Sequence, residues 1–214
     1  MSPKPVLSEA DREAIVRAVR EAERRTSGEI VVDIVESCGG YAHAVWKGAA
    51  LGGLAGALAA AAAHDLGGFW GGSAWLWGAL PAAAGAAAGY ALACAPAVKR
   101  WLATPEALGA RVRDRATAAF LEHEVFRTRD RTGILLFLAL FERRVLILGD
   151  RGINALVKDE EWAAVVAPVG EGMRAGRPLP ALLRAVEGAG ALLERHGFVR
   201  RPEDVNELPD APRG

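Results

Sequence analysis

Two stretches of the chain contain almost no charged side chains, and they determine the first prediction. Residues 44–63 and 72–98 consist largely of Ala, Gly and Leu, and between Lys47 and Lys99 the candidate charged residues are Asp65 and His64. A helix needs roughly 20 residues to cross the hydrocarbon core of a membrane. The pattern predicts a transmembrane helical hairpin over residues 44–100. A soluble pair of Ala-rich helices is the alternative, because Ala and Gly are only weakly hydrophobic.

Tryptophan and basic residues mark the ends of these two stretches. Tryptophans gather at membrane–water interfaces, and Lys and Arg are enriched on the cytoplasmic side. Here tryptophans lie at the outer ends and at the central connection. Lys and Arg lie at the outer ends, and the connection has neither. The candidate interface residues are Trp46, Trp70, Trp75, Trp77, Trp101, Lys47, Lys99 and Arg100. We therefore expect both flanking regions to lie in the cytoplasm, at the inner membrane of a bacterium.

Glycines recur at four-residue intervals within the two stretches. Small residues spaced in this way let membrane helices approach closely. The candidate packing residues are Gly48, Gly52 and Gly56 in the first helix and Gly85 and Gly89 in the second. Pro81 can kink the second helix.

The remaining sequence shows the periodicities of a soluble α/β domain. Helices are predicted over 8–25, from 105 to about 124, from about 159 to 174, where Pro168 can kink or split the helix, and over 180–196. Strands are predicted over 29–37, 132–140 and 143–149, with a tight turn at Phe141-Glu142 and a possible fourth strand near 152–157. Continuous apolarity predicts that the strands are covered on both faces.

These elements predict an α/β fold, a small three-layer α/β/α sandwich of three or four strands and about four helices. The sandwich is expected to consist of residues 1–43 and 101–199, interrupted by the hairpin, and residues 200–214 form a polar tail that we expect to be ordered only in part.

The composition and the first residues argue against several functions and structural features. The formal net charge is zero, which argues against a nucleic-acid partner. Cys38 and Cys94 are too few for a disulfide framework. The four histidines are scattered and are expected at surfaces or interfaces. The first residues lead directly into a charged helix without the apolar segment of a signal peptide, so we expect targeting to be internal.

The segments "ERRTSGEIVV", "DRTGILLFLALFERRVLILGDRGI" and "NELPD" together resemble the TPM-domain family. The branch with a membrane hairpin after the first strand is most similar. Members include thylakoid-lumen proteins of photosystem repair and bacterial membrane proteins. The resemblance implies the TPM fold and a phosphatase-like description, since some plant members are reported to be acid phosphatases. It also implies possible calcium binding, because some members bind calcium.

The acidic pattern of the family is altered in this chain. The usual Asp-Asn-Gly before the central strand is replaced by residues 131–133, Arg-Thr-Gly, with Asp130 one position upstream. The candidate catalytic acids are Glu142 and Asp150, and Asp159 and Glu160 can join Asp150 in a metal site. Glu142 and Asp150 are expected at opposite ends of one strand, too far apart to share an ion. Calcium needs six to eight oxygen ligands, so no cofactor is expected. The alternative is that Asp150 only shapes a turn.

Two hypotheses for function follow. The preferred one is a membrane-anchored, non-enzymatic TPM module that binds or assists another membrane or membrane-associated protein. The alternative is a divalent-metal-assisted, acid-phosphatase-like hydrolase. The lipid bilayer is an expected partner in either case. Alternating arginines near the second strand are either contacts for anionic lipid head groups or a solvated face; they are Arg111, Arg113, Arg115, Arg127, Arg129 and Arg131.

Overall fold

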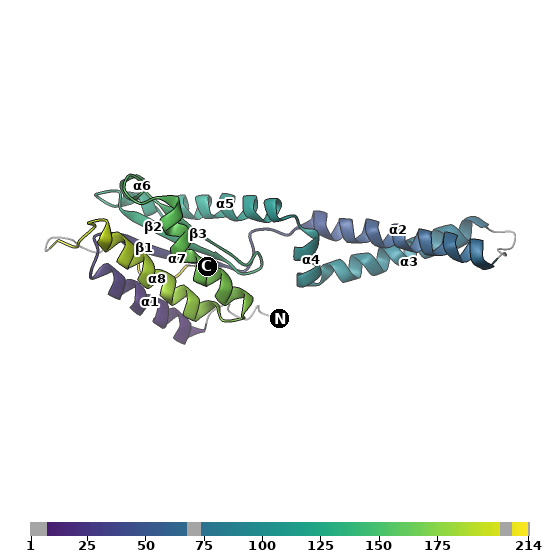
Figure 1. The fold of residues 1–214 in the computed structure, drawn as a ribbon, viewed down its shortest axis with the longest axis horizontal. Coiled ribbons are helices and arrows are strands. Elements are labelled where there is room, and N and C mark those ends of the chain that lie inside the picture. Colours follow the sequence, from purple (N-terminus) through teal and green to yellow (C-terminus); the bar gives the residue numbers. More distant parts are fainter. Residues whose placement is uncertain (1–7, 68–73, 202–206, 214) are drawn as a thin grey trace. The chain divides into compact units, whose positions relative to one another are not determined.

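The structure, a computed structural model, describes residues 8–67, 74–201 and 207–213 (Figure 1). The fold is mixed α/β. The chain divides into two compact units: residues 1–38 with 109–214 form an α/β unit, and residues 39–108 form a helical unit. Each is described by itself.

The α/β unit is built on a three-stranded sheet in the order β1-β2-β3. β1 (Glu29–Val35) pairs in parallel with β2 (Gly133–Ala139), and β2 pairs antiparallel with β3 (Arg144–Gly149). All seven residues of the central strand β2 are buried, whereas every residue of β3 is only partly buried. Coverage on both faces is therefore confirmed for β2, but β3 is an edge strand with fewer neighbours.

Helices pack on both faces of this sheet (Figure 1). One face carries α1 (Glu9–Glu23), α7 (Asp159–Arg174) and α8 (Pro178–Arg195). The opposite face carries α5 (Pro105–Glu122) and the short 3-10 helix η1 (Val125–Arg127). Side chains alternate along each strand, so neighbouring residues enter different cores: Val32 and Leu136 face α1 and α8, whereas Val31 and Leu135 face α5.

Local contacts explain how several elements begin and continue. A capping box starts α1: the Asp11 amide donates to Ser8 Oγ at 3.2 Å, and the Ser8 amide donates to Asp11 Oδ2 at 3.1 Å. α7 continues through Pro168 without a break. The possible fourth strand is wrong: α6 (Arg151–Asn154) occupies that region, and the Asp150 side chain caps it.

The helical unit consists of α2 (Ala42–Gly67), α3 (Ala74–Cys94) and α4 (Pro96–Leu102). The second apolar stretch is thus not one helix through residue 98. It ends at Cys94, and Pro96 begins a new short helix, where a missing N–H is tolerated. Pro81 lies inside α3, which is assigned as one continuous helix. The central connection, with Trp70, lies outside the described residues.

The described part of the C-terminal tail, residues 207–213, belongs to the α/β unit. It lies along the outer edge of β1, where Ile34 N donates to Arg213 O at 2.9 Å and Arg213 N donates to Val32 O at 2.9 Å. Leu208 is buried in the core beside α5. This segment is therefore an integrated part of the fold, with backbone and core contacts of its own.

Candidate functional site

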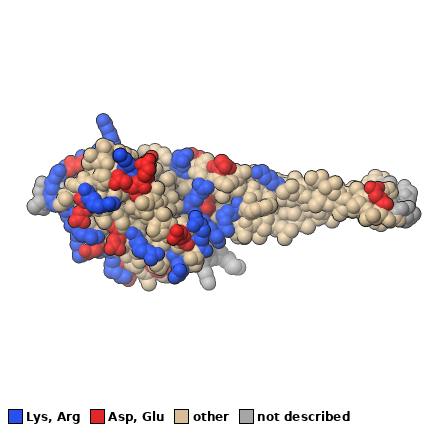
Figure 2. Space-filling model, viewed as in Figure 1, with Lys and Arg blue, Asp and Glu red and all other residues tan. Residues whose placement is uncertain are grey.

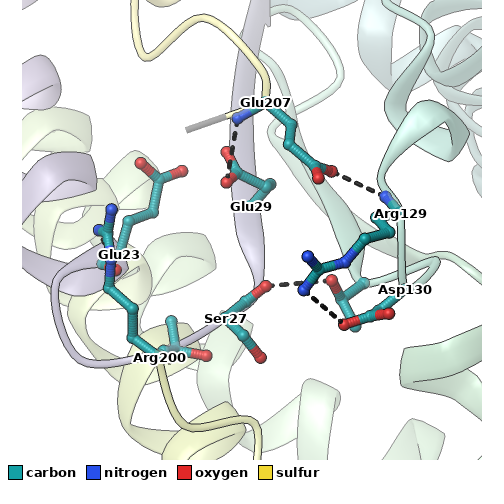
Figure 3. A pocket seen from close by; sticks show the side chains of 9 residues that line it. Glu23, Ser27, Glu29, Arg129, Asp130, Arg200 and Glu207 are labelled. Atoms are coloured by element: carbon teal, nitrogen blue, oxygen red, sulfur yellow. Dashed lines mark hydrogen bonds and ion pairs between the residues drawn. The ribbon is translucent and has the colours of Figure 1, made fainter. Parts of the chain in front are cut away.

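A polar pocket lies where the parallel strands β1 and β2 begin (Figure 3). It is lined by the end of α1, the turn into β1, the segment before β2, and two residues from the C-terminal region. The lining residues are Glu23, Thr26, Ser27, Glu29, Arg129, Asp130, Thr132, Arg200 and Glu207. The enclosed space measures about 20 Å³, which is enough for about one water molecule.

Two buried glutamates give this pocket its chemical character. Glu23, the last residue of α1, is 6% exposed, and its Oε1 accepts a hydrogen bond from Ile30 N at 2.8 Å. Burial raises the pKa of Glu23 to about 8; the hydrogen bond from Ile30 lowers the pKa, and the nearby Glu29 and Asp210 raise it. A buried carboxyl of this kind holds its proton at neutral pH and can donate it.

Glu29, the first residue of β1, is 9% exposed. Its Oε1 accepts a hydrogen bond from Glu207 N at 3.3 Å. Its Oε2 is buried and has no hydrogen-bond partner among the residues that the structure describes. Burial raises the pKa of this carboxyl as well. The pocket therefore contains two carboxyl groups whose pKa values are raised by burial.

The arginines and threonines around the two acids hold the backbone in place. Arg200 Nη1 donates to the Glu23 carbonyl at 3.0 Å. Thr132 Oγ1 donates to the Ser27 carbonyl at 3.0 Å. Arg129 lies 3.5 Å from the Asp130 carboxylate through Nη2. The arrangement ties the starts of two strands to the C-terminal segment, and its distinctive chemical property is the protonation of Glu23.

Glu142, a candidate catalytic acid, lies at the other end of the sheet. It occupies the turn between β2 and β3, is 4% exposed, and accepts hydrogen bonds from Cys38 N at 2.8 Å and Ser37 Oγ at 3.2 Å. Burial raises the pKa of the Cys38 thiol to about 12, and the Glu142 carboxylate adds to the effect. Cys38 is therefore a neutral thiol, and Glu142 joins the end of β1 to the turn.

Asp150 follows β3 and is the N-cap residue of α6. It is 8% exposed, and its Oδ1 accepts a hydrogen bond from Arg151 N at 2.7 Å. Arg131 Nη1 lies 3.5 Å from its Oδ2. Asp159 and Glu160 are exposed residues in the first turn of α7. Over the described ranges, no three His, Cys, Asp or Glu residues gather as a metal site.

Sequence reasoning missed the contact between Asp33 and His123. Asp33 lies inside β1, is 1% exposed, and its Oδ2 is 3.1 Å from His123 Nε2. His123, which was expected at a surface or an interface, has a side chain that is 13% exposed. The available signal was Asp33 in the middle of the apolar strand "EIVVDIV", because a buried charge requires a partner.

The helical unit presents a second candidate functional surface. Its glycines allow direct backbone contact: a Cβ added to Gly52 would overlap the carbonyl oxygen of Gly85, and one added to Gly89 would overlap that of Gly48. A Cβ at Gly56 would likewise overlap the Pro81 carbonyl. The five predicted packing glycines are thus brought together between α2 and α3.

Large apolar side chains point away from this glycine contact. Leu54 is 58% exposed, and the tryptophans are at least half exposed: Trp46 68%, Trp75 72%, Trp77 50% and Trp101 79%. Figure 2 shows few acidic or basic side chains on the visible face of this unit between its two ends. In length and composition, α2 over Ala42–Gly67 and α3 over Trp75–Cys94 would each suffice to cross a membrane.

The fold defines a class, a mixed α/β chain with a helical unit between its two α/β segments. No protein-family model matches the sequence, and no curated protein matches it either. A solved structure that matches is the NMR structure of the BA42 protein from the psychrophilic bacterium Bizionia argentinensis. The TM-score is 0.60 and the identity 21%, over 100% of this chain and 99% of that chain. At this identity, the likeness shows the fold alone.

Proposed function

We propose that this protein is a membrane-anchored α/β module of the TPM type. Helices α2 and α3 cross the inner membrane of a bacterium. The α/β unit, a three-layer α/β/α sandwich, acts on the cytoplasmic side. There it binds or assists another membrane or membrane-associated protein without catalysing a reaction.

The observation that carries this proposal is the placement of side chains in the helical unit: small residues lie between the helices, and large apolar residues lie on the surface. Gly48, Gly52 and Gly89 face the inside of the helix pair, whereas leucines and tryptophans face outward. In water, so much exposed apolar surface is unfavourable, at roughly 25 cal/mol for each Å². In a membrane the same surface meets lipid, and small residues at the helix contact are the expected pattern.

Charge supports the orientation. Lys47 lies in the first part of α2, and Lys99 and Arg100 lie in α4, which packs against α2 and α3. Asp65 lies near the opposite end of α2. The positive-inside rule then places the first end in the cytoplasm. Because two crossings return the chain to the same side, residues 1–38 and 109–214 can fold together there.

Thiol labelling tests this arrangement. Leu66, which is 90% exposed near the end of α2, is changed to Cys in a chain whose Cys38 and Cys94 are replaced by Ser. An impermeant maleimide added to spheroplasts should label this protein. Arg17→Cys, on the exposed face of α1, is the control and should be labelled only after lysis. The reverse pattern would contradict the orientation, and labelling of neither site before lysis would contradict the crossing.

The partner is sought with the full chain in native membranes. A photo-reactive amino acid on the exposed face of the α/β unit should crosslink to one or a few discrete proteins. Turnover of a phosphate ester that Asp150→Asn abolishes would instead favour a hydrolase.

A further inference from the structure

The outer edge of β1 is where the C-terminal tail binds. β1 is the last strand of the sheet on that side, and an edge strand is a template for pairing with another chain. Arg213 makes two backbone hydrogen bonds to it, to Val32 O and from Ile34 N, both of 2.9 Å. Ile30 N, further along β1, is bonded to the Glu23 carboxyl.

Side chains of the tail fit specific positions beside this edge. Asp210 Oδ2 lies 2.6 Å from Arg20 Nε, and the Asp210 side chain is 8% exposed. Leu208 is 9% exposed among the apolar residues beside α5. The Glu207 carboxylate accepts a hydrogen bond from Arg129 N at 2.8 Å. Residues 207–213 are thus held beside β1 by two backbone hydrogen bonds of Arg213, a buried leucine and two acids.

The tail is not an optimal strand for this edge. Pro209 and Pro212 have no N–H group and cannot donate to the ladder at those positions. An open groove of about 560 Å³ also runs between the tail and α1, with Arg12, Arg17 and Pro212 among its lining residues. A proline-free segment could form more ladder bonds than the tail and meet the same arginines.

We propose that the outer edge of β1 is a peptide-binding site for an extended acidic segment of a partner protein, and that residues 207–213 occupy it in cis. The partner adds a strand to the sheet, with a leucine in the place of Leu208 and an acid paired with Arg20. This inference rests on the proposed role as an interaction module and specifies how the partner is held. The tail acts as a tethered competitor, so binding requires its displacement.

Peptide binding tests the proposal. The probe is a fluorescein-labelled peptide with the sequence of residues 207–213, ELPDAPR, measured by anisotropy with protein in detergent. A chain that ends at Arg201 should bind it at least about tenfold more tightly than the full chain, because the tethered tail is removed. In the shortened chain, Arg20→Ala should weaken binding about fivefold or more. Arg24→Ala is the matched control, since Arg24 lies at the end of α1 outside this groove and pairs with Glu21 at 3.0 Å, and should change nothing.

Two results would overturn the proposal. One is a shortened chain that keeps its circular dichroism spectrum and does not bind the peptide; the other is an Arg20→Ala effect no larger than that of Arg24→Ala. If the shortened chain does not fold, the full chain with Asp210→Asn replaces it and should bind more peptide than the wild type; no gain overturns the proposal. Thiol labelling of the hairpin is independent of these outcomes, so a result against the peptide site would not contradict the proposed membrane anchor.

Discussion

Glu23→Gln should remove a large part of the pH dependence of the stability of the α/β unit. The pKa of Glu23 is about 8 in the folded chain, compared with an ordinary value of 4.5. Between these pH values the folded chain keeps a proton that the unfolded chain releases. Stability therefore falls as pH rises from about 4.5 to about 8 and is fully regained below that window.

The size of this effect follows from the difference in pKa. Each pH unit within this window lowers the free energy of unfolding by about 1.4 kcal/mol. The decrease is therefore at most about 5 kcal/mol over the whole window and about 3 kcal/mol by pH 7. Gln remains neutral and keeps an oxygen that can accept from Ile30 N. Glu23→Gln should therefore match the wild type near pH 4 and be more stable by a few kcal/mol at pH 8. The raised pKa of Glu29 leaves a smaller slope of the same sign.

Urea unfolding at a series of pH values measures this prediction. The chain to be measured has a Gly/Ser linker in place of residues 39–108. Trp162 is then the sole tryptophan, and it is 6% exposed in the folded α/β unit. Its fluorescence reports unfolding of this unit. Glu21→Gln is the control, because the Glu21 side chain is 60% exposed on the same helix, and it should follow the wild type. Parallel pH profiles for Glu23→Gln and the wild type would refute the reasoning.

Three further predictions concern the helix contact and the acids. Gly52→Ala should destabilise the helix pair by about 1–3 kcal/mol in detergent unfolding followed by circular dichroism, whereas Gly78→Ala, whose added Cβ meets nothing within 4 Å, should not. Glu142→Ala should lower the free energy of unfolding in urea by about 1–3 kcal/mol. It should also speed alkylation of Cys38 at pH 8, because it removes one cause of the raised thiol pKa. An unchanged unfolding free energy and an unchanged alkylation rate would show that Glu142 only shapes a turn. Calcium should shift the melting temperature of neither the wild type nor Asp150→Asn, and a shift in the wild type alone would reveal a calcium site.

Sequence patterns predicted the elements well where periodicity was strong. β2 and the helices that cover it were visible because the core selects apolar residues at regular spacing. The patterns could not separate β3 from β2, since both are apolar and only the order of strands decides which has two neighbours. The apolar residues after Asp150 suggested a strand, but the side chain of Asp150 starts a helix there.

The acids were harder to predict than the elements. Glu23 stands in "EAERR" and looks like part of a solvated helix face. It is buried because α1 ends over the start of β1, a contact between elements that the sequence does not show. Glu142 looked like a turn residue because its hydrogen-bond partners, Ser37 and Cys38, are more than 100 positions away in the sequence. Asp33 alone carried a local signal, as a charge within an apolar strand.

Carbonate extraction of two chains tests the central claim most directly. The full chain should stay in the membrane pellet at alkaline pH, since α2 and α3 are embedded in lipid. The chain with residues 39–108 replaced by a Gly/Ser linker should appear in the soluble fraction and unfold in one cooperative transition. A full chain released by carbonate would contradict membrane anchoring. A linked chain that aggregates or unfolds in two separate steps would contradict an α/β unit assembled from the two flanking segments.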